Sequence, residues 1–310
     1  MDSLRDQALA PLSRADAERL LPELTAGRQT LERRVLRARC LKHLESFDLA
    51  WAELNSVLPL VKDERLKARV AVDLLHLSYY LVRREDSLRF KEMAEARASA
   101  DPLILAELHL GSSIVNTASN EIREALRDAR RAEDALLGAP RGRGRDLVTT
   151  RAQRQLAHLL SHSGDYVGAR AAADLTVRHA ARLGDPAEVA WATYTVGFVD
   201  WFAGRLDSAV EAFTRAEAEL RQYGSSLWRH TLLCLARARL ERGELTEGER
   251  LARQSATGAV EDHGHIALLR GEIEVADLIL ARAPKGLPED EHFRDVVRAI
   301  VKAQQGDPRR

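Results

Sequence analysis

The stretch TYTVGFVDWFAGRLDSAVEAFTRA, residues 193–216, contains two helix-length segments separated by Gly204. On both sides of this glycine, apolar and small residues recur every three or four positions, which is the period of an amphipathic helix. Glycine supplies at low cost the left-handed backbone conformation that ends a helix. Gly197 and Ala209, seven positions before and five after Gly204, permit two antiparallel helices to approach closely. The stretch therefore predicts a helical hairpin.

The same pattern recurs along the chain. Further turn positions are predicted at Glu45, Glu85, Asn120, Gly164, Gly243 and Gly271. Small residues occupy nearly all equivalent contact positions, namely Ala38, Ser78, Ser113, Ala157, Ala236 and Gly264 before the turn and Ala50, Ala125, Ala169, Gly248 and Ala276 after it. Phe90 is the one large residue in the set. Such self-similarity predicts an array of stacked hairpins.

These positions resemble the tetratricopeptide repeat family. Its pattern is carried in order by Val196, Gly197, Gly204, Leu206, Ala209, Phe213 and Ala216, and it returns in residues 156–176 and 235–255. The resemblance implies an all-α fold, a right-handed α-solenoid of about seven antiparallel hairpins. The predicted turns are spaced 40, 35, 44, 40, 39 and 28 residues apart, against about 34 in the family. We therefore expect mostly longer helices and a truncated last unit.

The repeat pattern predicts three regions of the chain. Residues 1–30 form an N-terminal helical segment, residues 31–283 the solenoid, and residues 284–310 a C-terminal capping helix and tail. An open array needs such a cap to cover its last apolar face. The stretch GAPRGRGRD, residues 138–146, is interpreted either as a plain loop or as a division between two sub-bundles.

Composition excludes several classes of protein. With 47 basic and 47 acidic residues the chain has no net positive charge that would attract nucleic acid or anionic membranes. It has no signal-type N-terminus and no run of roughly twenty apolar residues, so we expect a cytoplasmic protein without a membrane partner. Cys40 and Cys234 lie too far apart for a metal-binding spacing and are interpreted as buried thiols.

Catalytic and cofactor motifs are missing from the sequence. It has neither a P-loop nor a nucleophile elbow, so we predict no enzyme and no cofactor. Two metal hypotheses, His158 with His162 and the stretch DHGH at 262–265, lack a convincing ligand set, and we predict no metal. Arg141, Arg143 and Arg145 are interpreted as a solvated loop, so nucleic acid is not an expected partner.

The resemblance also indicates where a ligand would bind. In this family, ligand-facing residues of the first helix lie thirteen, ten, six, three and two positions before the turn residue. Carried onto the unit that ends at Gly204, these positions are all aromatic: Trp191, Tyr194, Phe198, Trp201 and Phe202. The neighbouring units contribute Arg151, Arg154, His158 and His162 on one side and His230 and Arg237 on the other.

Such a surface suits a peptide or protein partner with an apolar anchor and a carboxylate, because arginine pairs with carboxylates bidentately and aromatic pockets bind anchors. The main hypothesis is thus a non-enzymatic scaffold or adaptor with a concave groove. Two other interpretations stay open for the aromatic stripe, packing against neighbouring units and a homodimer interface. An alternative function is the effector- or inhibitor-sensing region of a bacterial transcriptional regulator.

Overall fold

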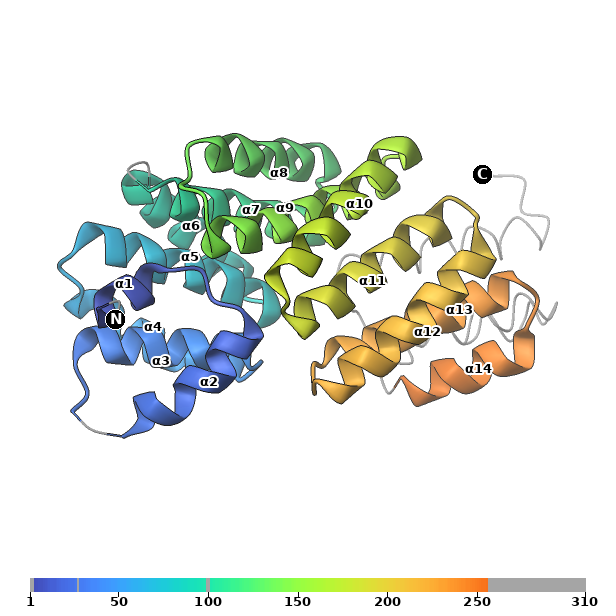
Figure 1. The fold of residues 1–310 in the computed structure, drawn as a ribbon. Helices are drawn as coiled ribbons and strands as arrows, with labels where there is room; N and C mark the ends of the chain where they lie inside the picture. Colours follow the sequence, from blue (N-terminus) through green and yellow to red (C-terminus); the bar gives the residue numbers. More distant parts are fainter. Residues whose placement is uncertain (1–2, 27, 99–100, 256–310) are drawn as a thin grey trace. The chain divides into compact units, whose positions relative to one another are not determined.

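The computed structural model describes residues 3–26, 28–98 and 101–255 (Figure 1). In these ranges all regular structure is helical. Contacts group the chain into two compact units, unit 1 with residues 1–117 and 121–195 and unit 2 with residues 118–120 and 196–310. No helix of the described ranges is both long enough and apolar enough to cross a membrane.

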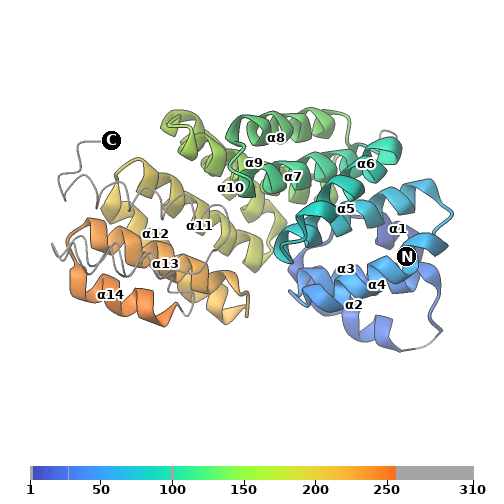
Figure 2. The ribbon, with the colours of Figure 1, turned by 180° about the vertical axis from the view of Figure 1, so that it is seen from behind.

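The helices that fall in unit 1, apart from the last residue of α7, are α1 (Leu4–Leu9), α2 (Arg14–Thr25), α3 (Leu31–His43), α4 (Phe47–Val57), the one-turn 3-10 helix η1 (Leu58–Leu60), α5 (Glu64–Tyr80), α6 (Arg84–Ala98), α7 (Pro102–Ala118), α8 (Ile122–Leu137), α9 (Arg143–His162) and α10 (Tyr166–Leu183). Helix α11 (Pro186–Phe202) contains the boundary between the units. Unit 2 continues with α12 (Leu206–Gln222), α13 (Leu227–Glu241) and α14 (Leu245–Gln254). The hairpins of each unit follow one another in chain order, as Figure 2 shows from behind.

One kind of turn joins the two helices of each hairpin. Gly204 has a φ of 73°, and the N–H of Arg205 donates to the Asp200 carbonyl at 2.8 Å. This is the bond pattern of a Schellman motif, which satisfies carbonyls at the end of a helix. The same bond closes the turns after α3, α5, α7, α9 and α13 at 2.7 to 2.9 Å. The turns predicted at Glu45, Asn120, Gly164 and Gly243 are confirmed, each with a positive φ.

The turn predicted at Glu85 is wrong. Val82 carries the positive φ of 55°, and Glu85 lies in the first turn of α6. The error came from choosing the register by small residues alone. With the turn at Val82, the contact position of the second helix is Ser87, whose hydroxyl lies 2.6 Å from that of Ser78. Phe90 is therefore not a contact residue of the pattern and fills the core of unit 1, whereas Leu75, seven positions before Val82, becomes the one large residue in the set.

Small residues bring paired helices close together, as the pattern predicts. In unit 1 the Ser113 hydroxyl of α7 donates to the Ala125 carbonyl of α8 at 2.9 Å. In unit 2 a Cβ atom on Gly197 would lie 2.9 Å from the Phe213 ring, which leaves no room for a larger residue. Six of the seven expected hairpin turns lie in the described residues. The seventh predicted turn, at Gly271, and the capping helix at 284–310 lie outside them, as does the stretch at 262–265.

The arginine-rich stretch is only partly a loop. Gly138–Gly142 connects α8 to α9, whereas Arg143 and Arg145 belong to α9. The Arg143 guanidinium donates to the Leu183 carbonyl at 2.8 Å, and that of Arg145 donates to the Ala139 carbonyl at 3.2 Å. Two of the three arginines therefore bind the protein's own backbone.

Candidate functional site

In unit 1, polar side chains link the first helices of successive hairpins. Arg39 of α3 donates to Asp73 of α5 at 2.7 Å, and Arg69 of α5 donates to Glu107 of α7 at 2.5 Å. Between α7 and α9, the Gln155 amide donates to the Thr117 hydroxyl at 2.9 Å. These contacts show that the first helices lie side by side within the unit.

The charges of this row are buried. Lys42 also pairs with Asp73, so three cations face the two carboxylates Asp73 and Glu107. Burial alone would raise the pKa of Asp73, but Lys42 and Arg39 outweigh it and hold that pKa well below its usual range. Arg39 and Arg69 still have buried N–H groups without a hydrogen-bond partner among the described residues. The row therefore has an excess of positive charge and of donors.

Two predicted site residues, Arg151 and Arg154, continue this row in α9. Both pair with Glu188 of α11, at 3.0 and 3.2 Å, and their side chains are 14% and 17% exposed. The Arg154 guanidinium also lies over the ring of Trp191, 4.3 Å from its centroid. One carboxylate thus serves two guanidinium groups beside a half-buried aromatic ring.

Tyr194 and the two histidines of α9 differ in accessibility. The Tyr194 side chain is only 2% exposed and makes an edge-to-face contact with His158, with centroids 5.6 Å apart. His162 is exposed at the end of α9. In the described ranges, no group of three or more His, Cys, Asp or Glu side chains could hold a metal ion. His158 is therefore best understood as a ring that packs on Tyr194.

The other three aromatic residues of the stripe belong to unit 2, because the boundary falls after Thr195. Phe198 is 8% exposed and packs against Trp201 and Phe202, with centroids 6.1 and 4.7 Å away. The Trp201 indole donates to Glu241 of α13 at 2.9 Å. Burial raises the pKa of Glu241, although this hydrogen bond and Arg237 oppose the shift.

The last two predicted site residues lie in α13. His230 is exposed and its ring lies 3.6 Å from the buried Cys234 sulfur, whereas Arg237 is half-buried. The structure thus divides the aromatic stripe by accessibility: Tyr194 and Phe198 are core residues of their own units, and Trp191, Trp201 and Phe202 keep part of their surface exposed.

Sequence reasoning missed the buried row formed by Arg39, Arg69, Asp73 and Glu107. A usable signal is present in the sequence, because the full set of ligand-facing positions is predicted only for the units that end at Gly164, Gly204 and Gly243 and can be extended to the earlier units. Counting six residues back from Glu45 gives Arg39, and counting thirteen back from Asn120 gives Glu107. Arg69 lies thirteen before the correct turn residue, Val82, and so depended on the register that the small residues misassigned.

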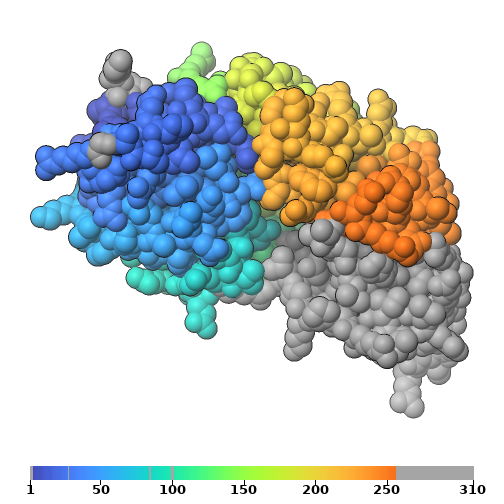
Figure 3. Space-filling model, turned by 90° about the horizontal axis from the view of Figure 1, so that it is seen from below, coloured from blue at the N-terminus to red at the C-terminus, as the bar shows by residue number. Residues whose placement is uncertain are grey.

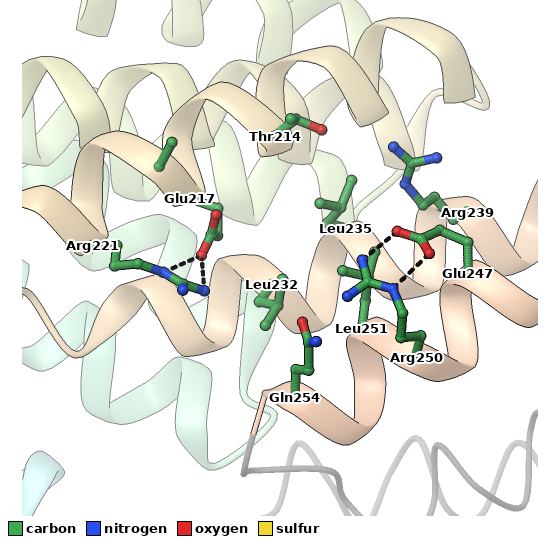
Figure 4. A pocket seen from close by; sticks show the side chains of 11 residues that line it. Thr214, Glu217, Arg221, Leu232, Leu235, Arg239, Glu247, Arg250, Leu251 and Gln254 are labelled. Atoms are coloured by element: carbon green, nitrogen blue, oxygen red, sulfur yellow. Dashed lines mark hydrogen bonds and ion pairs between the residues drawn. The ribbon is translucent and has the colours of Figure 1, made fainter.

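Side chains of α12, α13 and α14 line an open surface pocket of about 430 Å³ in unit 2 (Figure 4). Leu232, Leu235 and Leu251 form its apolar part. Two ion pairs stand at its margin, one between Arg221 and Glu217 and one between Arg250 and Glu247. None of the predicted site residues lines this pocket.

Comparisons with known proteins decide the fold. No known family profile matches the chain, and no curated protein has a significant sequence match. A solved structure titled Rap protein complexed with competence and sporulation factor is 14% identical, with a TM-score of 0.62 over 94% of this chain and 84% of that one. The chain has a tetratricopeptide-repeat-like fold.

Two further structures share this tetratricopeptide-repeat-like arrangement. A tetratricopeptide repeat protein from Parabacteroides merdae ATCC 43184 is 13% identical, with a TM-score of 0.53 over 89% of this chain and 98% of that one. A signal-transduction ATPase with a tetratricopeptide repeat sensor, from Pyrococcus horikoshii, is 15% identical, with a TM-score of 0.54 over 93% of this chain and 45% of that one. At sequence identities this low, these matches show that the folds are similar and do not show the function.

Proposed function

We propose that this protein is a non-enzymatic cytoplasmic adaptor that binds a peptide or protein partner. The partner would bind on the face of unit 1 formed by the first helices of its hairpins, α3, α5, α7 and α9, which we call the first-helix face. One observation carries the proposal: Arg151 and Arg154 share the single carboxylate of Glu188 beside Trp191. The pair keeps one positive charge in excess, and the two side chains remain 14% and 17% exposed. A partner carboxylate would supply the missing charge.

The chemistry of the partner follows from these contacts. A guanidinium binds a carboxylate through two parallel N–H···O bonds, which fixes orientation as well as charge. The exposed part of Trp191 offers apolar surface for an anchor side chain, and tryptophan and arginine are enriched among residues that dominate binding energy. We therefore expect a partner with an apolar anchor next to a carboxylate. The similar Rap structure is itself a complex with a named factor, which supports looking for a bound partner.

A capture experiment tests this proposal. The wild-type chain and an Arg154→Glu variant are each used as bait, and bound proteins are identified by mass spectrometry. We expect a specific partner whose capture falls at least tenfold with Arg154→Glu, because that substitution replaces attraction by repulsion. Arg127→Glu on the exposed side of α8 is the matched control and should retain the partner. Equal capture by both variants would show that this face is not the binding site.

The alternative function, effector sensing, is favoured by the pocket in unit 2. Its volume of about 430 Å³ would hold a small molecule, although the pocket is open to solvent and would leave part of the ligand exposed. A thermal-shift screen with small metabolites tests it, with Leu235→Trp as a variant that fills the pocket. A ligand that stabilises the wild type but not this variant would favour sensing over the adaptor role. Light scattering at several concentrations tests the remaining alternative, a homodimer.

A further inference from the structure

The chain's own N-terminal segment already binds the first-helix face of unit 1. Between α1 and α2 the backbone is extended, with φ and ψ of −67° and 146° at Ala10 and −93° and 172° at Ser13. The carbonyls of Ala8 and Ala10 accept hydrogen bonds of 2.7 and 2.8 Å from Arg39, and the Leu12 carbonyl accepts one of 2.8 Å from Arg151. In Figure 1 the segment can be followed from α1 to the start of α2.

From Ala10 to Ser13 the segment is bound in the way that an extended peptide would be, and Ala8 and Leu9, which precede it, are the last two residues of α1. Every second carbonyl is held by a guanidinium group, and this recognition uses main-chain atoms that any peptide offers. Ala8, Leu9 and Leu12 are buried, so apolar side chains supply the remaining contacts. The blue surface of Figure 3 shows the N-terminal helices packed as a continuous part of unit 1. Main-chain bonding together with buried apolar side chains is a known mode of peptide recognition.

The segment does not use all the donors on this face. Arg39 bonds Asp73 through Nε and the segment through Nη1, but its buried Nη2 has no partner among the described residues. A buried donor that stays unsatisfied costs free energy. A peptide with an additional acceptor, such as a carboxylate, would bind this face better than the segment does, and a ligand shifts an equilibrium only through such a difference.

Little structure holds the segment in place from its N-terminal side. Helix α1 has six residues, which is too short to be stable in water without tertiary contacts. Its charged contact beyond the segment, between Arg5 and Asp63, is exposed, and exposed ion pairs contribute little. Release of the segment would cost the burial of Ala8, Leu9 and Leu12 and the hydrogen bonds from Arg39 and Arg151, and a partner peptide that displaces the segment would have to replace these contacts.

We propose that residues 8–13 are an internal occupant of a peptide-binding face on α3 and α9, and that an extended partner peptide with a carboxylate displaces them. The inference rests on the proposed function, because Arg151 holds both the Leu12 carbonyl and Glu188. It adds regulation to that site, since the bound segment competes with the partner. The local concentration of a tethered segment makes such competition effective.

Binding of a labelled peptide to the full chain tests this inference. The probe is a fluorescein-labelled peptide with the sequence of residues 3–13, measured by fluorescence anisotropy. The full-length double variant Leu9→Glu with Leu12→Glu weakens the internal segment, so we expect it to bind the probe at least tenfold more tightly than the wild type. Leu4→Glu, on the exposed part of α1, should behave like the wild type. A folded double variant that binds no more tightly than the wild type overturns the inference.

Hydrogen exchange of the wild type covers the case in which the double variant does not fold. We expect the peptide that spans residues 3–13 to exchange at least tenfold faster than α3 and α9, because it opens while the array stays folded. Equal protection of all three regions contradicts a displaceable segment.

The outcomes separate this inference from the proposed function. In one outcome the double variant binds the probe more tightly and Arg154→Glu leaves partner capture unchanged. This outcome supports the internal occupant and refutes the partner site at Arg154. Loss of capture with Arg154→Glu, combined with unchanged probe binding, supports the partner site and assigns residues 3–13 a purely structural role.

Discussion

The guanidinium of Arg154 lies 4.3 Å from the centroid of the Trp191 ring, and its Nη1 lies 3.2 Å from the carboxylate of Glu188. One side chain of α9 thus makes both the aromatic and the ionic contact within unit 1. A cation over a tryptophan ring contributes on the order of 0.5 to 2 kcal/mol, depending on its desolvation. The contacts expected of a partner already exist inside the unit, so a partner carboxylate would share the two guanidinium groups with Glu188.

Glu188→Gln should tighten partner binding by several-fold, because Arg151 and Arg154 lose their internal carboxylate while keeping a neutral acceptor. The same change should lower the free energy of unfolding by about 1 to 3 kcal/mol, since two partly buried cations lose their ion pair. Titration calorimetry with the captured partner and chemical denaturation measure the two effects. Glu124→Gln on the surface of α8 should leave partner affinity unchanged. Weaker binding by Glu188→Gln would mean that Glu188 itself contacts the partner.

Gly197→Ala should destabilise the hairpin of α11 and α12. The new Cβ atom would lie 2.9 Å from the Phe213 ring, which is fully buried and cannot move freely. Overpacking of this kind costs about 1 to 3 kcal/mol, which equals or exceeds the gain in helix propensity of about 1 kcal/mol, and the rigid surroundings of Phe213 favour the upper part of that range. Chemical denaturation of Gly197→Ala, Phe213→Leu and the double variant measures the coupling energy between the two positions. Independent effects of the two substitutions would show that the close contact does not limit packing.

Val82→Gly should stabilise the protein by about 1 to 2 kcal/mol, because a β-branched residue in the left-handed region pays a steric cost that glycine avoids. Glu85→Gly is the matched comparison, since Glu85 lies in α6 and a helical glycine is unfavourable. Thermal melts of both variants and of the wild type rank their stabilities. If Glu85→Gly were the stabilising change, the turn would be at the position that the small-residue pattern suggested.

Acid should destabilise unit 1 through His76. Its ring bonds the Glu107 carbonyl at 3.1 Å, and burial, followed by Lys42, lowers its pKa to about 4. Between pH 6.5 and about 4 the unfolded chain binds a proton on His76 that the folded chain does not, so the free energy of unfolding falls as the pH falls.

We expect the contribution of His76 to reach about 1 to 2 kcal/mol after allowance for its partial exposure. Denaturant midpoints between pH 7 and 4.5 measure the slope. The slope should decrease in His76→Gln and persist in His162→Gln, whose imidazole is exposed at the end of α9. An unchanged slope in His76→Gln would assign the acid sensitivity to other groups.

Local chemistry made the hairpins predictable from sequence. The turns at Gly164, Gly204 and Gly243 follow from the conformational freedom of glycine, and helix-period patterns identify the segments between them. The turn at Val82 was misplaced because no glycine marks it and each of the two registers has one small contact residue, Ser78 for a turn at 85 and Ser87 for a turn at 82. Where the backbone preference of a residue and its structure disagree, sequence alone gives the wrong register.

The family pattern also indicated which positions could face a ligand, but it did not determine which of them are open. Trp191 and Tyr194 lie on the same helix and belong to the same predicted surface, yet Tyr194 is buried and Trp191 is not. The bond from Arg151 to the Leu12 carbonyl joins residues 139 positions apart. The sequence by itself determined the helices and most turns, because these depend on neighbouring residues. Tertiary structure decided burial and the contacts of the N-terminal segment with α3 and α9, because these join distant segments.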